Sequence, residues 1–152
     1  MSKLAIRKLN EEKQRNSEYW AAFKSRAWNN AVFRDSGIMW DGDPHPYGDY
    51  WDKTIRSSDV HLNAKINRKK NKLSVEIYIV HDDKLFEKLQ AKKSVIEEAA
   101  DGLKLEWGSK INNWIRTFKD GVNIDDDTQW EEQHDWMINT MLKMYAAVKD
   151  YL

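Results

Sequence analysis

Three charged residues of this chain could together support metal-dependent hydrolysis. Asp59 stands at the start of one expected strand, and Asp82 and Lys84 follow the end of the next. A restriction-type nuclease uses two carboxylates to hold Mg²⁺ and a lysine, placed two residues after an acid, to support the attacking water. Asp82 and Lys84 have this spacing, but they also open an expected helix, where an aspartate is an ordinary cap.

The acids inside the expected strands do not supply the nuclease pattern. Glu76 and Glu106 are followed two residues later by Tyr78 and Gly108, where a nuclease core would carry a lysine. No glycine-rich phosphate loop follows a strand, and no serine stands in a nucleophile elbow. We therefore favour a chain without an active site. The catalytic residues of the alternative, a metal-dependent nuclease or nuclease subunit, would be Asp59, Asp82 and Lys84.

The residues that commonly hold metals are too scattered to predict a metal site. The four histidines stand at positions 45, 61, 81 and 134, and no two have metal-ligand spacing on one helix. The run Asp41-Gly-Asp-Pro-His45 has the composition of a turn. The chain has no cysteine, so it has neither a thiolate nucleophile nor a cysteine zinc site. We expect no metal and no cofactor.

Charge is unevenly distributed although the 25 basic and 25 acidic residues cancel. Residues 53–72 carry seven basic side chains against one acid, whereas residues 120–135 carry seven acids and no lysine or arginine. A basic hairpin tip can contact phosphates, but lysines also protect a solvated turn from aggregation. The residues available for nucleic-acid binding are Lys65, Arg68, Lys69, Lys70 and Lys72. Because the whole chain is neutral, we expect such binding to be weak.

A hairpin is expected to position most of these residues. Residues 60–67 and 72–80 alternate apolar and polar side chains, and the polar residues between them suit a four-residue turn. If Asn67 faces Lys72, the apolar rows of both strands lie on the same face. A shift by one residue would expose one row to water, which fixes the register. The expected pairs are Val60 with Ile79, Leu62 with Ile77, Ala64 with Val75 and Ile66 with Leu73.

This register also predicts which side chains lie on each face of the hairpin. His61 should lie beside Tyr78 on the outer face as an ordinary cross-strand pair. The helix that begins at Asp82 should lie on the apolar face. The residues expected to be buried together are Leu62, Ile77, Phe86, Leu89 and Ile96.

Helical and strand patterns continue on both sides of the hairpin. The expected helices run from residue 10 or 17 to about 30, from Asp82 or Asp83 to Gly102, and from Trp130 to the last residue. A capping box, Thr128-Gln-Trp-Glu131, should start the last helix. Further strands are expected over residues 53–58, 103–107 and 113–118. A long aromatic loop over residues 35–52 could be pinned by Met39, Trp40, Tyr47, Tyr50 and Trp51.

This order predicts one α+β domain over residues 1–152. Two hairpins should build an antiparallel sheet of about four to five strands, which helices cover on one face. The chain has no apolar run of about 18 residues and no signal-peptide pattern at its start. We therefore expect a soluble cytoplasmic protein without a membrane partner.

The chain also resembles a bacterial family, the domain of unknown function 4268. The similarity lies in Tyr19-Trp20 with Phe23, in Val75-Glu76-Ile77 before Lys84-x-Phe86-x-x-Leu89, in Ile96-Glu97, in Leu105-Glu106-Trp107, and in Trp130 with Trp136. Members often follow a restriction-endonuclease-like nuclease module, and the family has no assigned catalytic residues. The resemblance implies an accessory domain associated with nuclease or defence systems.

Together these observations favour a non-catalytic recognition or interaction module with a protein partner. Two alternatives stay open: the metal-dependent nuclease described above, and a weak nucleic-acid-binding module that uses the basic hairpin.

Overall fold

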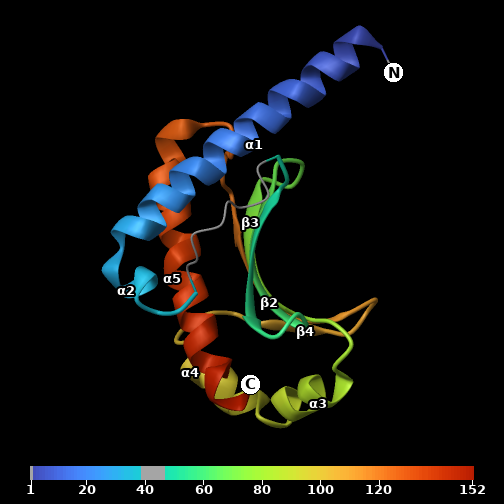
Figure 1. Cartoon of the computed structure of the whole chain (residues 1–152), viewed down its shortest axis with the longest axis vertical. Helices are drawn as coiled ribbons and strands as arrows, with labels where there is room; N and C mark the ends of the chain where they lie inside the picture. The colour runs from blue at the N-terminus through green and yellow to red at the C-terminus, as the bar shows by residue number, and fades with distance from the viewer. Residues whose placement is uncertain (1, 39–46) are drawn as a thin grey trace.

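The computed structural model describes residues 2–38 and 47–152 and contains a five-stranded antiparallel sheet (Figure 1). The strands are β1 (Tyr50–Arg56), β2 (Val60–Asn67), β3 (Lys72–Ile79), β4 (Glu106–Gly108) and β5 (Asn113–Asp120). The helices are α1 (Lys3–Asn29), α2 (Ala31–Arg34), α3 (Asp83–Ala91), α4 (Lys93–Ala99) and α5 (Trp130–Val148), with 3-10 turns at η1 (Asp127–Gln129) and η2 (Lys149–Tyr151). This is the expected α+β architecture.

The hairpin of β2 and β3 has the predicted register. Asn67 lies opposite Lys72, and Leu62 lies opposite Ile77. On its other side β3 pairs with β5, where Ile77 lies opposite Ile115. The strand order is β1-β2-β3-β5-β4, so β3 is the central strand.

The core lies between the apolar face of the sheet and two long helices. α5 packs on β2 and β3, and α1 packs against α5 (Figure 1). The Tyr19 hydroxyl on α1 donates a hydrogen bond to Gln133 Oε1 on α5, at 3.0 Å. Trp20 and Phe23 are also fully buried. The two helices therefore cover one face of the sheet.

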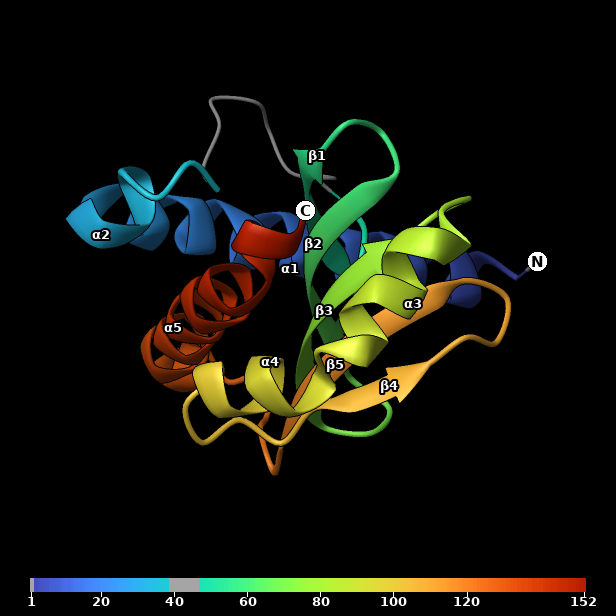
Figure 2. The same cartoon turned by 90° about the horizontal axis from the view of Figure 1, so that it is seen from below.

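The helix predicted from Asp82 packs on the apolar side of the sheet, as expected, but at one end of it and in two pieces. The segment divides at Lys92, which leaves helical geometry, into α3 and α4. These short helices lie at one end of the sheet, where the Phe86 and Trp107 rings are 6.2 Å apart (Figure 2). α5, which has the longer buried stripe, covers the part of the apolar face over β2 and β3. The five predicted core residues are nevertheless buried: Leu62, Ile77, Phe86, Leu89 and Ile96.

Two helix starts also differ from the prediction. α1 begins at Lys3, where the Ser2 hydroxyl accepts a hydrogen bond from the Ala5 amide at 3.1 Å. The predicted capping box does not form at Thr128. Asp126 caps the short turn η1 instead, since its carboxylate accepts from the Thr128 amide at 3.1 Å, and α5 follows at Trp130.

The described end of the aromatic loop is pinned to α1. Asn16 Nδ2 donates to the carbonyl of Tyr47 at 3.1 Å, and Trp20 Nε1 donates to the carbonyl of Gly48 at 3.0 Å. Of the residues expected to pin the loop, Trp51 is buried in β1, and Met39 and Trp40 lie outside the described residues.

β1 is the predicted short strand, and it begins earlier in the chain, at Tyr50. The predicted second hairpin consists of β4, which is shorter than expected, and β5, which is longer. None of the described helices is both long and apolar enough to cross a lipid bilayer.

Candidate binding site on the open face of the sheet

The sheet face that points away from α1 and α5 carries rows of polar and aromatic side chains. Side chains alternate between the two faces of a strand, so the register places one residue of each strand in the same row. The middle row contains Asp52, Asn63, Glu76, Arg116 and Glu106. The next row contains Thr54, His61, Tyr78, Trp114 and Gly108. We call this surface the open face.

A buried carboxylate lies at the centre of the open face. Glu76 is 1% exposed, and its Oε1 atom lies 2.8 Å from Lys65 Nζ. Its Oε2 atom accepts a hydrogen bond from Arg116 Nε at 2.8 Å. Burial alone would raise the pKa of Glu76, but hydrogen bonds and charges from Lys65, Arg116 and Asn63 hold this pKa below its ordinary value. The carboxylate is therefore ionised and neutralised by two cations.

Asn63 presents an unused acceptor beside this carboxylate. Its Nδ2 atom donates to Glu76 Oε1 at 3.3 Å. A carboxylate only accepts hydrogen bonds, so the amide nitrogen must face Glu76 and Oδ1 must point away. Asn63 is 7% exposed, and within the described part of the chain Oδ1 has no hydrogen-bond partner. Oδ1 is also closed off from solvent, so this unpaired buried acceptor costs free energy in the folded protein.

The aromatic row supports the same network from one side. The Arg116 guanidinium carbon lies 3.7 Å from the centroid of the Trp114 ring. A side chain at Gly108 would displace that ring, because a Cβ atom built there lies 2.0 Å from Trp114 Cζ2. The His61 and Tyr78 rings are 6.1 Å apart, as the hairpin register predicts. Gly108 thus makes room for the indole that supports Arg116.

Both nitrogens of His61 are engaged by acceptors. Nδ1 lies 3.0 Å from Asp52 Oδ2, and Nε2 lies 2.9 Å from the carbonyl oxygen of Ser58. Both ring nitrogens are therefore held by neighbouring groups of the protein.

Two adjoining hollows lie on the open face and share Lys65 and Glu76. The first, of about 350 Å³, extends over β1, β2 and β3 and is lined by Tyr50, Asn63 and Tyr78 among others. The second, of about 320 Å³, extends toward the turn between β2 and β3. Its charged lining residues are Lys65, Lys70, Lys72 and Arg116 against Asp49 and Glu76. Together the two hollows form a groove, whose first hollow is polar with balanced charges and whose second hollow is basic.

The residues predicted for nuclease chemistry meet, but an arginine lies between the two acids. Arg56 Nη2 is 2.6 Å from Asp59 Oδ2 and 2.5 Å from Asp82 Oδ2. Hydrogen bonds from Arg56 and Ser57 lower the pKa of Asp59 to about 2. Asp82 also caps α3, because its Oδ1 atom accepts a hydrogen bond from the Leu85 amide at 2.9 Å. This is the helix-cap role that the sequence offered as the alternative to a metal ligand.

The other requirements of a hydrolytic centre are missing from the same place. Lys84 is exposed on α3. Across residues 2–38 and 47–152, no group of three or more histidine, cysteine, aspartate or glutamate residues could hold a metal ion. The guanidinium of Arg56 occupies the position that a cation would need between the carboxylates.

The five basic residues predicted for nucleic-acid binding do not form one surface. Arg68 Nε lies 2.8 Å from Asp125 Oδ1, and the same guanidinium bonds to Asn16 on α1. Lys65 and Lys72 lie on the open face, where Lys72 Nζ is 4.1 Å from the centroid of the Phe118 ring. Lys69 and Lys70 are exposed at the turn. Asp125, one of the seven acids of residues 120–135, thus neutralises Arg68 at the hairpin tip.

Comparison with known proteins places this fold in a family. The family described as Domain of unknown function (DUF4268) matches residues 15–152. The chain belongs to the DUF4268 family. No curated protein and no solved structure matches it. The open face lies entirely within the matched residues.

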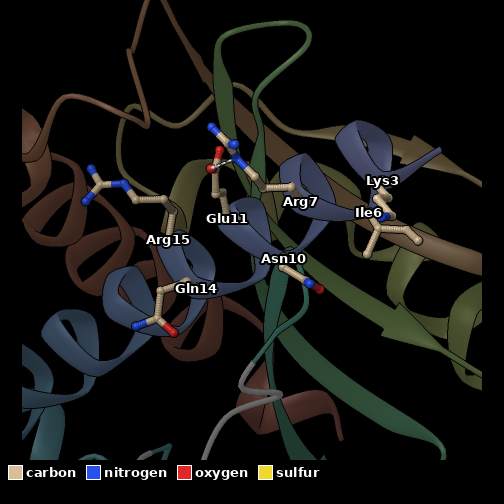
Figure 3. A pocket seen from close by; sticks show the side chains of 7 residues that line it. All are labelled: Lys3, Ile6, Arg7, Asn10, Glu11, Gln14 and Arg15. Carbon is tan, nitrogen blue, oxygen red and sulfur yellow. Dashed lines mark hydrogen bonds and ion pairs between the residues drawn. The ribbon is translucent and has the colours of Figure 1, made fainter.

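A further hollow, lined almost entirely by residues that precede the DUF4268 match, is a weaker site. It runs along the first turns of α1 and is lined by residues of that helix alone, from Lys3 to Arg15 (Figure 3). The Arg7 and Glu11 side chains pair across it at 3.4 Å, and both are exposed. With a single wall it cannot enclose a ligand.

Asn63, Glu76 and Arg116, at the centre of the open face, were missed as site residues by sequence reasoning, whereas Lys65 was predicted for nucleic-acid binding. The hairpin register already places Asn63 opposite Glu76, which is an unusual pair for the middle of a sheet. Arg116 could not be added, because the pairing of β3 with β5 brings together residues 40 positions apart. The signal available in the sequence was a glutamate in the middle of a strand, opposite an asparagine on the neighbouring strand, which indicates a polar site on that face.

Proposed function

We propose that this DUF4268 domain is a non-catalytic recognition module that binds its ligand on the open face of the sheet. The observation that carries the proposal is the buried Glu76, held by Lys65 and Arg116, where two adjoining hollows of the open face meet. Such a network fixes its side chains before a ligand arrives, and preorganisation favours binding.

The same contacts argue for recognition and against catalysis. A general base needs a free lone pair within reach of the ligand's proton. Both Glu76 oxygens accept hydrogen bonds from cations, and both His61 nitrogens face acceptors. Glu76 and His61, the titratable groups at the centre of the open face, are therefore already engaged by other side chains and the backbone. The association with a nuclease or defence system, and a protein partner, stay predictions that rest on the family resemblance.

Amide chemical shifts can test where the domain binds. We would titrate labelled protein with three probes: a single-stranded 12-nucleotide DNA of mixed sequence, a uridine mononucleotide, and a mixture of extended random peptides. We expect at least one probe to move the amides of β2, β3 and β5 around Asn63, Glu76 and Arg116. Glu76→Gln should weaken this response, while Glu87→Gln, an exposed change on α3, should leave it unchanged.

Two results would overturn the proposal. One is a response that maps to another surface, such as the first turns of α1. The other is the absence of any response to all three probes at millimolar concentration.

A further inference from the structure

We propose that the ligand of the open face is single-stranded nucleic acid, with an unpaired base in the hollow beside Asn63 and phosphates at the basic end of the groove. This inference rests on the proposed function and names the ligand class. It moves the binding surface from the hairpin tip, which Arg68 and Asp125 partly neutralise, to the face of the sheet.

The hollow beside Asn63 suits the hydrogen-bonding edge of a base. Besides two tyrosines, its lining includes the charged side chains Asp52, Lys65 and Glu76. Every unpaired base carries at least one N–H donor on its Watson–Crick edge, and proteins read such edges in single strands. In a duplex these donors are already paired. A lining of aromatic and charged side chains therefore favours single strands.

The side chains around the hollow provide surfaces on which bases can stack. Tyr50 and Tyr78 line it from β1 and β3, the two neighbours of β2. Tyr50 lies opposite Lys65 and Tyr78 lies opposite His61, four residues along β2, so the two tyrosines stand at opposite ends of the hollow. Beside Tyr78, on β5, the Arg116 guanidinium carbon lies 3.7 Å from the centroid of the Trp114 ring. Aromatic rings and guanidinium planes both stack with bases, largely without regard to sequence.

The basic end of the groove suits the backbone that joins these bases. Lys70 and Lys72 line the second hollow with Lys65 and Arg116. The Glu76 carboxylate also lies there, but Lys65 and Arg116 offset its charge. An anionic strand that crosses from the first hollow to the second would therefore meet the base-binding groups and then the lysines. An extended peptide has no comparable need for a cationic end beside stacking surfaces.

The test is fluorescence anisotropy with a labelled single-stranded 12-nucleotide DNA, the same sequence as RNA, its duplex and a labelled uridine mononucleotide. We expect both single strands to bind at least tenfold more tightly than the duplex and the mononucleotide. Tyr78→Leu should weaken single-strand binding about 10- to 100-fold, because one stacked base is lost.

Salt dependence separates phosphate contacts from nonspecific charge. Changing Lys70 and Lys72 to glutamine should make the slope of log K against log salt shallower by about 1.4, since two contacts release counterions from a single strand. The matched control changes Lys69 and Lys84 to glutamine, two exposed lysines that line neither hollow. It should leave the slope almost unchanged. Thermal melts would verify that all variants fold.

The outcomes distinguish this inference from the proposed function. Equal binding of duplex and single strand, or equal slopes in the two double variants, would overturn the nucleic-acid inference. So would mononucleotide binding as tight as that of the 12-nucleotide strands. If peptides alone move the amides around Glu76, the nucleic-acid inference fails and the recognition module survives. If no probe affects that face, both fail.

Discussion

Arg116 Nε lies 2.8 Å from Oε2 of Glu76, and this contact joins two neighbouring strands whose residues are 40 positions apart in the chain. Lys65 approaches the other carboxylate oxygen from the opposite strand. A single buried acid therefore links β2, β3 and β5. Most isolated ion pairs on a protein surface contribute little to stability, but the carboxylate of this one is excluded from water.

Glu76→Gln should lower the free energy of unfolding by about 1–3 kcal/mol, because it removes the charge that Lys65 and Arg116 face. Arg116→Gln should lower it less, since the arginine side chain is 28% exposed. The double variant should be more stable than the sum of the single losses predicts, by at least about 0.5 kcal/mol. Urea melts measure all three, and strict additivity would show that the contact contributes nothing.

Ile77→Ala should cost about 2–5 kcal/mol of stability, because Ile77 is 1% exposed and its loss leaves a cavity beneath α5. Val95→Ala is the control, since Val95 is 52% exposed on α4 and should change stability by less than about 0.5 kcal/mol. A loss below about 1 kcal/mol for Ile77→Ala would contradict the assigned core face.

The stability of the protein should fall as the pH decreases from 6.5. Burial, with the nearby charge of Arg26, lowers the pKa of His134 from 6.5 to about 3, and Arg26 Nη1 lies 2.6 Å from its Nδ1 atom. The unfolded chain therefore binds a proton that the folded protein does not. The contribution is fully present above pH 6.5 and is lost progressively toward pH 3.

His134→Asn should remove this dependence while it keeps an acceptor for Arg26. Between pH 6 and 5 the wild-type free energy of unfolding should fall by up to about 1.4 kcal/mol more than that of the variant. Few carboxylates titrate in this range. Identical pH slopes for the two proteins would show that His134 is not the group responsible.

The protein should not hydrolyse nucleic acid in Mg²⁺ or Mn²⁺, because Arg56 occupies the space between Asp59 and Asp82. Plasmid, single-stranded DNA and RNA are the substrates. Cleavage that disappears in both Asp82→Ala and Lys84→Ala, yet persists in the exposed α3 variant Lys88→Ala, would support the nuclease alternative instead.

Arg68 and Lys69 should differ in their effects although they are neighbours at the hairpin tip. Arg68→Gln should reduce stability by about 1 kcal/mol, because it breaks hydrogen bonds to Asn16 and Asp125. Lys69→Gln should not reduce stability, because Lys69 is exposed. Equal stability of the two variants in urea melts would contradict the structural role of Arg68.

Duplex DNA should bind the native protein no more tightly than about 10⁻⁶ M at physiological salt.

The sequence determined those features whose partners are close along the chain. Alternation in two adjacent segments fixed the register of Leu62 with Ile77, because any shift would have exposed an apolar row to water. The same register placed His61 beside Tyr78 and identified the core residues on β2 and β3. The helical segments were identified for the same reason, since a stripe of apolar residues needs only local spacing.

Only the tertiary structure decided which helix covers the sheet and which residues meet on its open face. α3 and α5 both carry apolar stripes, and local patterns do not determine which stripe fills the space above β2 and β3. The partners of Glu76 and Asp82 come from β2, β5 and the end of β1, and the choice among many charged side chains depends on long-range strand pairing. Ion pairs have no periodicity in sequence, so only the folded arrangement of the strands determines which charged side chains meet.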